Sequence, residues 1–250
     1  MKHKSIKLIS FLLLFIPSVL FAQEVGASPF SGLDIETILK PTGFTSTINL
    51  LVALSSIGLI PFFLISTTSF LRTVIVLSMI RQAIGTQSSP PNPIIIALAM
   101  FMTIFVMTPT WNEVNESAVK PYKAGKISQN EAIELGAKPF RNFMLKFIRD
   151  KDLALFLEFS QMKSVNDYEN VPIFVLIPSF VISELKTAFQ IGFLLFIPFV
   201  VIDLIVSNIL LSLGMFMLSP AMISLPFKIL LFVLTDGWNL IIRGLLISFQ

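Results

Sequence analysis

The sequence predicts an all-α, multi-span membrane protein of helical hairpins, with a small helical extracytoplasmic domain. Of its 250 residues, 54% are hydrophobic and 13% are charged, and the mean hydropathy is +0.84. Soluble domains carry about 25% charged residues, so this composition is that of an integral membrane protein. Two stretches, from Pro41 to Leu71 and from Gln82 to Asn112, contain no charge. Each exceeds the roughly 20 residues that cross a bilayer as a helix.

Residues 1–22 have the pattern of a secretory signal peptide. They begin with lysines, continue with an apolar run from Leu8 to Phe21, and end on Ala22, a small residue before the expected cut. Cleavage after Ala27 and an uncleaved first helix are the alternatives. Residues 23–47 are mixed in character, contain Pro and Gly, and are expected to form an exported linker.

Residues 48–110 are expected to hold the first two membrane-type helical segments. Ile48–Ile65 and Ile94–Thr108 are the spanning candidates, and the connector GTQSSPPNP is a loop because Pro cannot continue a helix. Arg72 and Arg81 are nine residues apart, which places them about 180° apart around a helix. They therefore form no single basic stripe. By the positive-inside rule we expect both to lie on the cytoplasmic side.

The composition becomes polar in residues 111–170, where acidic and basic side chains occur in equal number. Ser128 and Glu131 have the spacing of a capping box, which starts a helix. Five apolar side chains then repeat at the spacing of one helix face: Phe140, Phe143, Met144, Phe147 and Ile148. We expect a small polar helical domain on the outer side of the membrane.

Residues 171–250 are expected to form C-terminal helical hairpins with a turn between them. The stretch from Val171 to Pro220 is almost wholly apolar, but three charges and two prolines interrupt it: Glu184, Lys186, Asp203, Pro178 and Pro198. As one straight helix, this stretch would be much longer than the hydrocarbon layer of about 30 Å. It must therefore bend, fold back as a hairpin, or leave the lipid.

Charges inside these apolar segments need partners. A charged side chain costs about 2.5–3.5 kcal/mol at the centre of a membrane helix, so it is kept only where protein or water meets it. Glu184 and Lys186 are about 200° apart around a helix and cannot pair with each other. Asp236 and Arg243 share a helix face but stand about 10 Å apart along the axis, too far for a direct ion pair. We expect these four charges, together with Asp203, to make contacts between subunits.

The residue types present exclude several kinds of chemistry. The chain contains no Cys, and its single histidine, His3, lies in the expected signal peptide. Zinc sites and Ser-His-Asp catalysis therefore lack their usual groups, and we expect neither enzyme activity nor a cofactor. The formal charge of +3 comes wholly from the three lysines at the N-terminus, so the sequence implies no nucleic-acid-binding surface.

Two alternative functions would use acidic residues of the late helices. An intramembrane aspartyl protease needs paired carboxylates. Neither Asp203 nor Asp236 has the Tyr-Asp or Gly-x-Gly-Asp setting that is associated with such proteases. An ion- or proton-coupled secondary transporter could use the same two aspartates. A transporter should move a solute when reconstituted alone, whereas a channel subunit that needs partners should not.

The segment LGMFMLSP reads as a turn near the end of the apolar stretch. Gly214 permits a tight turn, and Met215, Phe216 and Met217 are large apolar side chains beside it. Packing inside a core is the simplest explanation of such residues. In a ring of subunits, the same three side chains would close a pore by excluding water while yielding to a passing chain.

Four long segments resemble the FliP family of flagellar biosynthetic proteins, which are membrane components of the type III secretion export gate. The segments are SFLRTVIVLSMIRQAIGTQSSPPN, KPFRNFMLKFIRDKDLALF, IPSFVISELKTAFQIGFLLFIPFVVIDL and MISLPFKILLFVLTDGWNL. The resemblance covers about Thr42 to Phe249, and runs of this length are highly specific. The signal peptide and the exported domain favour the flagellar branch over the related virulence-secretion subunits.

The resemblance implies a pore-forming core subunit, of which several copies assemble with FliQ and FliR beside FlhA and FlhB. Such a gate passes unfolded flagellar proteins across the bacterial inner membrane at the basal body. In the family, a Gly-Met-Met-Met-like turn supplies a methionine gasket at the constriction. Met215 and Met217 match that turn, while Phe216 replaces the usual Met. The resemblance also implies that mature subunits sit largely above the bilayer once assembled.

Overall fold

The computed structural model describes residues 55, 58–59, 61–86, 88–160 and 171–250. The chain divides into two units, Met1–Gly58 and Leu59–Gln250, and the second unit holds helices α4 to α11. The expected signal peptide and the exported linker lie outside the described residues. The regular structure described in the second unit is helical throughout, which confirms the predicted all-α class.

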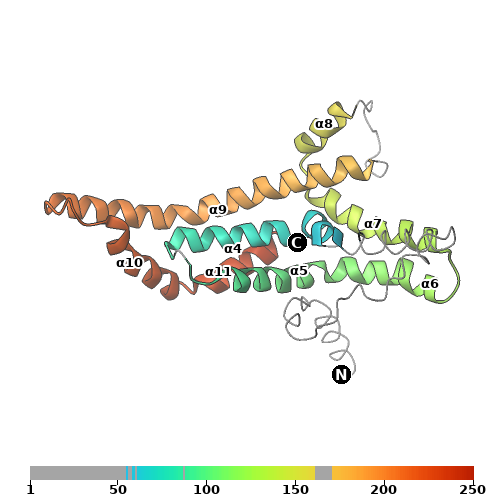
Figure 1. Ribbon diagram of the computed structural model, residues 1–250, viewed down its shortest axis with the longest axis horizontal. Coiled ribbons are helices and arrows are strands. Elements are labelled where there is room, and N and C mark those ends of the chain that lie inside the picture. The colour runs from blue at the N-terminus through green and yellow to red at the C-terminus, as the bar shows by residue number, and fades with distance from the viewer. Residues whose placement is uncertain (1–54, 56–57, 60, 87, 161–170) are drawn as a thin grey trace, which may run out of the picture. The chain divides into compact units, whose positions relative to one another are not determined.

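The helices of the second unit follow one another as shown in Figure 1. Their bounds are α4 (Phe70–Ile84), α5 (Asn92–Val114), the π-helical segment η2 (Asn115–Val119), α6 (Lys120–Lys123), α7 (Gln129–Phe147), α8 (Asp150–Phe159), α9 (Ile173–Ser212), α10 (Pro220–Leu234) and α11 (Gly237–Ile247). Helix α9 packs against α4, α7, α8 and α10, so most of the unit is built on this one helix.

Glycine, proline and serine fix several helix boundaries. Gly85 ends α4 with a φ of 88°, in the left-handed region that glycine adopts without a steric penalty. Pro220 is the first residue of α10, where its missing N–H needs no partner. Before α7, the Ser128 hydroxyl oxygen accepts a hydrogen bond from the Glu131 backbone N–H at 3.3 Å. This contact confirms the serine half of the predicted capping box.

Helix α9 continues without a break for 40 residues (Figure 1). At about 1.5 Å per residue it is about 60 Å long, roughly twice the thickness of the hydrocarbon layer. The apolar stretch therefore does not fold back before Ser212. Of the three predicted options, the structure contradicts a hairpin within this helix, while bending and departure from the lipid stay predictions. Pro178 and Pro198 lie inside α9, where each removes one backbone hydrogen bond.

Two hydrophobic cores lie along α9. The larger core joins α4, α5, α10 and α11 to the middle of α9, and Val76 and Leu77 of α4 are completely buried in it. The second core joins α7 and α8 to the first turns of α9, around Met144 and Phe180. Because α9 contributes to both, it fixes the polar α7–α8 segment relative to the apolar helices of this unit.

The predicted apolar face of α7 is confirmed. Met144 is buried, and Phe143, Phe147 and Ile148 pack against the same core. Phe140 meets Trp111 of α5 edge-on, with ring centroids 5.1 Å apart. This face therefore holds α7 between α9 and the end of α5.

The helices agree with a membrane protein of several spans. Two of them are long and apolar enough to cross a membrane: α9, and the continuous helix Asn92–Lys123 that joins α5, η2 and α6. Two bent pairs also qualify if each is one span. These are Pro61–Thr67 with α4, bent by 82°, and α10 with α11, bent by 63°. Helix Asn92–Lys123 crosses the expected boundary at residue 110, and the division into domains stays a prediction.

Candidate functional site

A buried ion pair links α4 to α9. The Arg72 guanidinium donates to both carboxylate oxygens of Glu184, from Nη2 to Oε1 at 2.5 Å and from Nε to Oε2 at 2.8 Å. The two side chains are 3% and 0% exposed. Nη1 of Arg72 donates to the Ser248 carbonyl at 2.9 Å and to its hydroxyl oxygen at 3.1 Å. Each guanidinium nitrogen therefore has an acceptor, which a buried charge requires.

Aromatic rings complete the surroundings of Arg72. Its Cζ lies 4.0 Å from the centroid of the Phe249 ring and 5.2 Å from that of Phe147. A desolvated cation over aromatic rings is stabilised by up to about 2 kcal/mol. Through Ser248 and Phe249, this cluster holds the C-terminal residues against α7 and α9.

A second ion pair joins α8 to α9. Lys186 Nζ pairs with Asp152 Oδ1, and the Ser183 hydroxyl donates to Asp152 Oδ2 at 2.9 Å. The Asp152 side chain is 2% exposed, whereas that of Lys186 is 52% exposed. Burial raises the pKa of Asp152, but the bonds from Lys186 and Ser183 and the charges of Lys186 and Arg149 outweigh burial. The pKa of Asp152 is therefore below its usual value.

The contact between α8 and α9 should weaken in acid. A carboxyl group with a lowered folded pKa adds stability above its unfolded pKa of about 3.9, and that contribution is lost as the pH falls through the folded pKa. Hydrogen exchange of the α8 amides should differ between the native chain and Asp152→Asn at about pH 6, and the difference should disappear as the pH falls through the lowered folded pKa of Asp152. Equal protection at the higher pH would show that the ionised carboxylate adds no stability.

A third ion pair joins α9 to α10. Lys228 Nζ lies 2.6 Å from Asp203 Oδ2, and the Ser224 hydroxyl donates to Asp203 Oδ1 at 2.6 Å. Lys228 also donates to the Ala83 carbonyl near the end of α4, at 3.5 Å. Sequence reasoning assigned no partner to Lys228. A lysine inside an apolar run carries the same cost as the charges of α9, and this observation could have identified it.

The remaining predicted charges are less enclosed. Asp236 and Arg243 are exposed, and their side chains make no ion pair or hydrogen bond with any residue that the structure describes. Arg81 Nη1 donates to the Pro90 carbonyl at 3.1 Å and to Asn92 Oδ1 at 2.6 Å. The expected cytoplasmic location of the two arginines of α4 stays a prediction.

Glu184 and Lys186 bind different partners, as their positions on opposite faces of the helix predict. These two charges and Asp203 find their partners within the chain, on α4, α8 and α10. Contacts of the five charges between subunits stay a prediction, as does ion-coupled transport through Asp203 and Asp236. Across residues 61–86, 88–160 and 171–250, no group of His, Cys, Asp and Glu side chains is arranged to hold a metal.

A glycine closes α9 at the turn before α10. Gly214 has a φ of 74°. Its N–H bonds to the Leu211 carbonyl at 3.1 Å, and the Met215 N–H bonds to the Leu210 carbonyl at 3.0 Å. These two bonds are the Schellman motif, which satisfies free carbonyls at a helix end and favours glycine at the left-handed position. The structure thus confirms the turn predicted from LGMFMLSP.

The turn presents apolar side chains at the surface. Met215, Phe216 and Met217 are 46%, 76% and 100% exposed. In Figure 1 this turn lies at the left end of α9, at the opposite end of the helix from α7 and α8. Core packing within the chain therefore does not explain these three residues.

The exposed turn continues into a wide apolar surface on α9 and α10. Its large exposed side chains include Phe193, Leu194, Leu204, Ile205, Phe227, Leu230, Val233 and Leu234. Monomeric soluble proteins rarely expose a contiguous apolar patch larger than a few hundred Å². This surface therefore needs lipid or another protein chain to cover it.

Comparison with known proteins identifies the family. A sequence model of the FliP family matches residues 53–245. The chain belongs to the FliP family. Flagellar biosynthetic protein FliP of Bacillus subtilis is 50% identical over 217 residues, which cover 87% of this chain and 98% of that protein. FliP of Borreliella burgdorferi is 43% identical over 247 residues, which cover 96% of this chain and 97% of that protein.

A further relative, FliP of Pectobacterium carotovorum, is 47% identical over 240 residues, covering 95% of this chain and 90% of that protein. Membership of the FliP family confirms the resemblance seen in the sequence and makes the chain a membrane protein of flagellar biosynthesis. The FliP match includes the charges of the three ion pairs and the exposed turn between α9 and α10.

Proposed function

We propose that this FliP-family chain is a pore-forming core subunit of the flagellar type III protein export gate. Several copies assemble in the bacterial inner membrane with FliQ and FliR, near FlhA and FlhB. The assembled gate passes unfolded flagellar proteins and performs no catalytic step. Family membership supports a role in flagellar biosynthesis, and the exposed apolar turn supports the pore.

The observation that carries the proposal is the exposure of Met215, Phe216 and Met217 at a helix end. An apolar constriction that contains no water stops ions, because an ion would have to lose its hydration shell to enter it. Unbranched methionine side chains adapt their shape at little cost, so they can yield to a passing polypeptide and close behind it. Several copies of this turn around an axis would form such a constriction, and Phe216 would make it bulkier.

Polar substitutions in the turn should make the closed gate leak. In the assembled complex in liposomes, Met217→Ser and Met215→Ser should each raise ion conductance severalfold, because a hydroxyl group lets water remain in the constriction. Met217→Leu preserves an apolar side chain and should remain tight.

A substitution outside the turn provides the control for the leak experiment. Phe159→Ser also removes a large exposed apolar side chain, 79% exposed at the end of α8, and should not raise the conductance. If the methionine variants are as tight as the native complex, the turn does not close the gate.

Assembly is tested by co-expressing the chain with FliQ and FliR and measuring the stoichiometry of the purified complex by native mass spectrometry. The proposal expects several copies of this chain in each particle, which would bury the apolar surface of α9 and α10. A stable, solitary chain that moves a solute after reconstitution would contradict the proposal and support the transporter alternative.

A further inference from the structure

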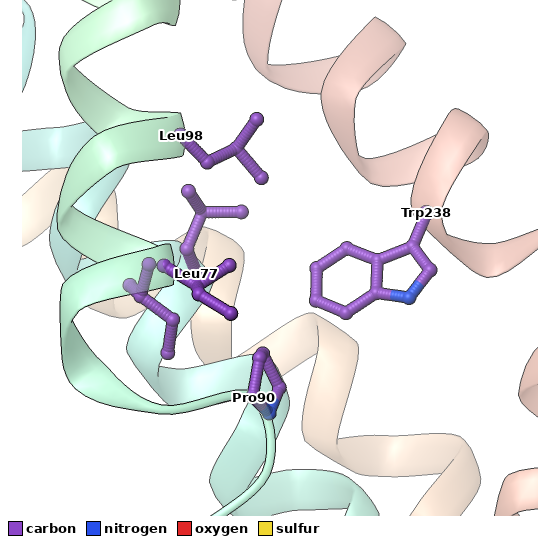
Figure 2. A pocket seen from close by; sticks show the side chains of 6 residues that line it. Leu77, Pro90, Leu98 and Trp238 are labelled. Atoms are coloured by element: carbon purple, nitrogen blue, oxygen red, sulfur yellow. The ribbon is translucent and has the colours of Figure 1, made fainter.

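An apolar hollow of about 150 Å³ lies between α4, the start of α5 and α11 (Figure 2). Its walls are Leu77, Pro90, Ile94, Ile95, Leu98 and Trp238. Only apolar atoms face this space, so its lining suits a small hydrocarbon group. If the hollow were empty, the side chains that line it would make fewer dispersion contacts.

Trp238 forms one side of this hollow. In Figure 2 its six-membered ring points toward Leu77 and Leu98, and the nitrogen-containing ring lies on the far side. The hollow is not fully enclosed by the chain, and Trp238 is 37% exposed. Tryptophan in this position is typical of the boundary between hydrocarbon and headgroups, since the ring is apolar and its N–H is polar.

A positive charge is hydrogen-bonded to one wall of the hollow. Arg81 Nη1 donates hydrogen bonds to the carbonyl of Pro90 and to the side-chain oxygen of Asn92. Pro90 is itself a wall of the hollow. Both acceptors are neutral, and Arg81 has no carboxylate partner in the described part of the chain. A guanidinium group has five N–H donors in a planar fork that matches a phosphate. Its Nε and Nη2 therefore remain available to an anion.

The polar groups lie at the start of the helix and the apolar walls farther along it, which is the order of the headgroup and the acyl chain in a phospholipid. Asn92 begins the membrane-type helix Asn92–Lys123, so Arg81, Pro90 and Asn92 mark one end of a candidate span. Leu98 lies about 9 Å farther along the same helix, at 1.5 Å per residue. A headgroup at Arg81 would thus place the first part of an acyl chain against Ile94 and Leu98.

We propose that this hollow binds one acyl chain of an anionic phospholipid, whose phosphate group lies on Arg81. Hydrocarbon tails are as apolar as leucine, so the hollow positions the chain but provides little preference over the surrounding bilayer. The preference comes from the charge, because an arginine near the headgroups favours an anionic lipid by about fivefold. The site goes beyond the proposed role in export and does not depend on the turn between α9 and α10.

The test is photo-cross-linking of the full-length chain within its membrane complex. The probes are phosphatidylglycerol and phosphatidylcholine, each with a diazirine on the acyl chain, and the labelled peptides are mapped by mass spectrometry. We expect labelling at Ile94, Leu98 or Trp238, about fivefold stronger with phosphatidylglycerol. Arg81→Gln should remove this preference and leave the phosphatidylcholine labelling unchanged.

Two further variants separate the hollow from general contact with the bilayer. Leu98→Phe fills the space and should reduce labelling by both lipids. Lys126→Gln removes a positive charge just beyond the far end of the helix Asn92–Lys123, which is about 48 Å long, and should change neither. If Leu98→Phe does not fold, the comparison of Arg81→Gln with Lys126→Gln still decides. Equal labelling of the native chain by the two lipids would overturn the proposal. So would the absence of lipid labelling at Ile94, Leu98 and Trp238 in the native chain.

Discussion

Replacing Arg72 by alanine should lower the free energy of unfolding by about 3–5 kcal/mol. The substitution leaves the Glu184 carboxylate, which is 0% exposed, without its two guanidinium donors. It also removes the cation beside the Phe249 ring and one donor to the Ser248 carbonyl. The measurement is denaturant unfolding of the full-length chain in detergent. A loss below about 1 kcal/mol would show that water or rearrangement replaces the lost partner.

Two controls test whether the loss of stability comes from leaving a buried charge unpaired or simply from breaking an ion pair. The double variant Arg72→Met with Glu184→Leu replaces both charges by apolar groups and should regain most of the lost stability, because no unpaired charge remains. Lys120→Ala breaks the Lys120–Glu116 pair of α6 and η2, whose side chains are 59% and 65% exposed. That change should cost about 0.5 kcal/mol or less.

The need for partners is visible in the sequence, but the partners are not. Because charged side chains in apolar segments need partners, Glu184 and Lys186 must each contact another polar or charged group. Their separation around the helix excludes an ion pair between the two. Arg72 and Glu184 are 112 residues apart, so no local spacing connects them. Asp152 lies in a polar segment, where a carboxylate is ordinarily solvated. The fold buries it against α9, and only that packing makes it the partner of Lys186.

Helix α9 shows why the path of an apolar stretch is harder to predict than its class. Pro178 and Pro198 are breaking signals in a soluble helix, and the length of the stretch suggests a hairpin. In the structure, packing against α4, α7, α8 and α10 holds the helix together through both prolines. Residue types and their spacing predict where helical segments and turns lie. They do not predict how far tertiary contacts extend a helix.

The three ion pairs leave one end of α9 without a charged anchor. Glu184 and Lys186 fix its first half to α4 and α8, and Asp203 fixes it to α10. Beyond Asp203 the helix continues for nine residues to Ser212, and most of its large side chains there are exposed. The turn that carries Met217 therefore lies at the far end of a helix that ion pairs fix to α4, α8 and α10. In the proposed gate, this arrangement would let neighbouring copies complete the packing at that end.

Replacing Gly237 by alanine should destabilise the chain by about 1–3 kcal/mol through overpacking. A Cβ at this first residue of α11 would overlap the ring of Phe232 on α10. That ring is 8% exposed and stands edge-on to Trp238, with centroids 5.3 Å apart. A buried aromatic ring moves only as a whole, so the 63° bend between α10 and α11 would have to open.

Gly244→Ala is the matched control in the same helix. A Cβ at Gly244 meets nothing within 4 Å. Since alanine favours a helix interior over glycine by about 0.8–1.0 kcal/mol, this variant should be neutral or more stable. Thermal unfolding of the two variants in detergent should therefore give Tm changes of opposite sign, or a loss for Gly237→Ala alone. Similar Tm increases for both would mean that Gly237 is not in close contact with Phe232, and that the bend does not depend on a missing side chain.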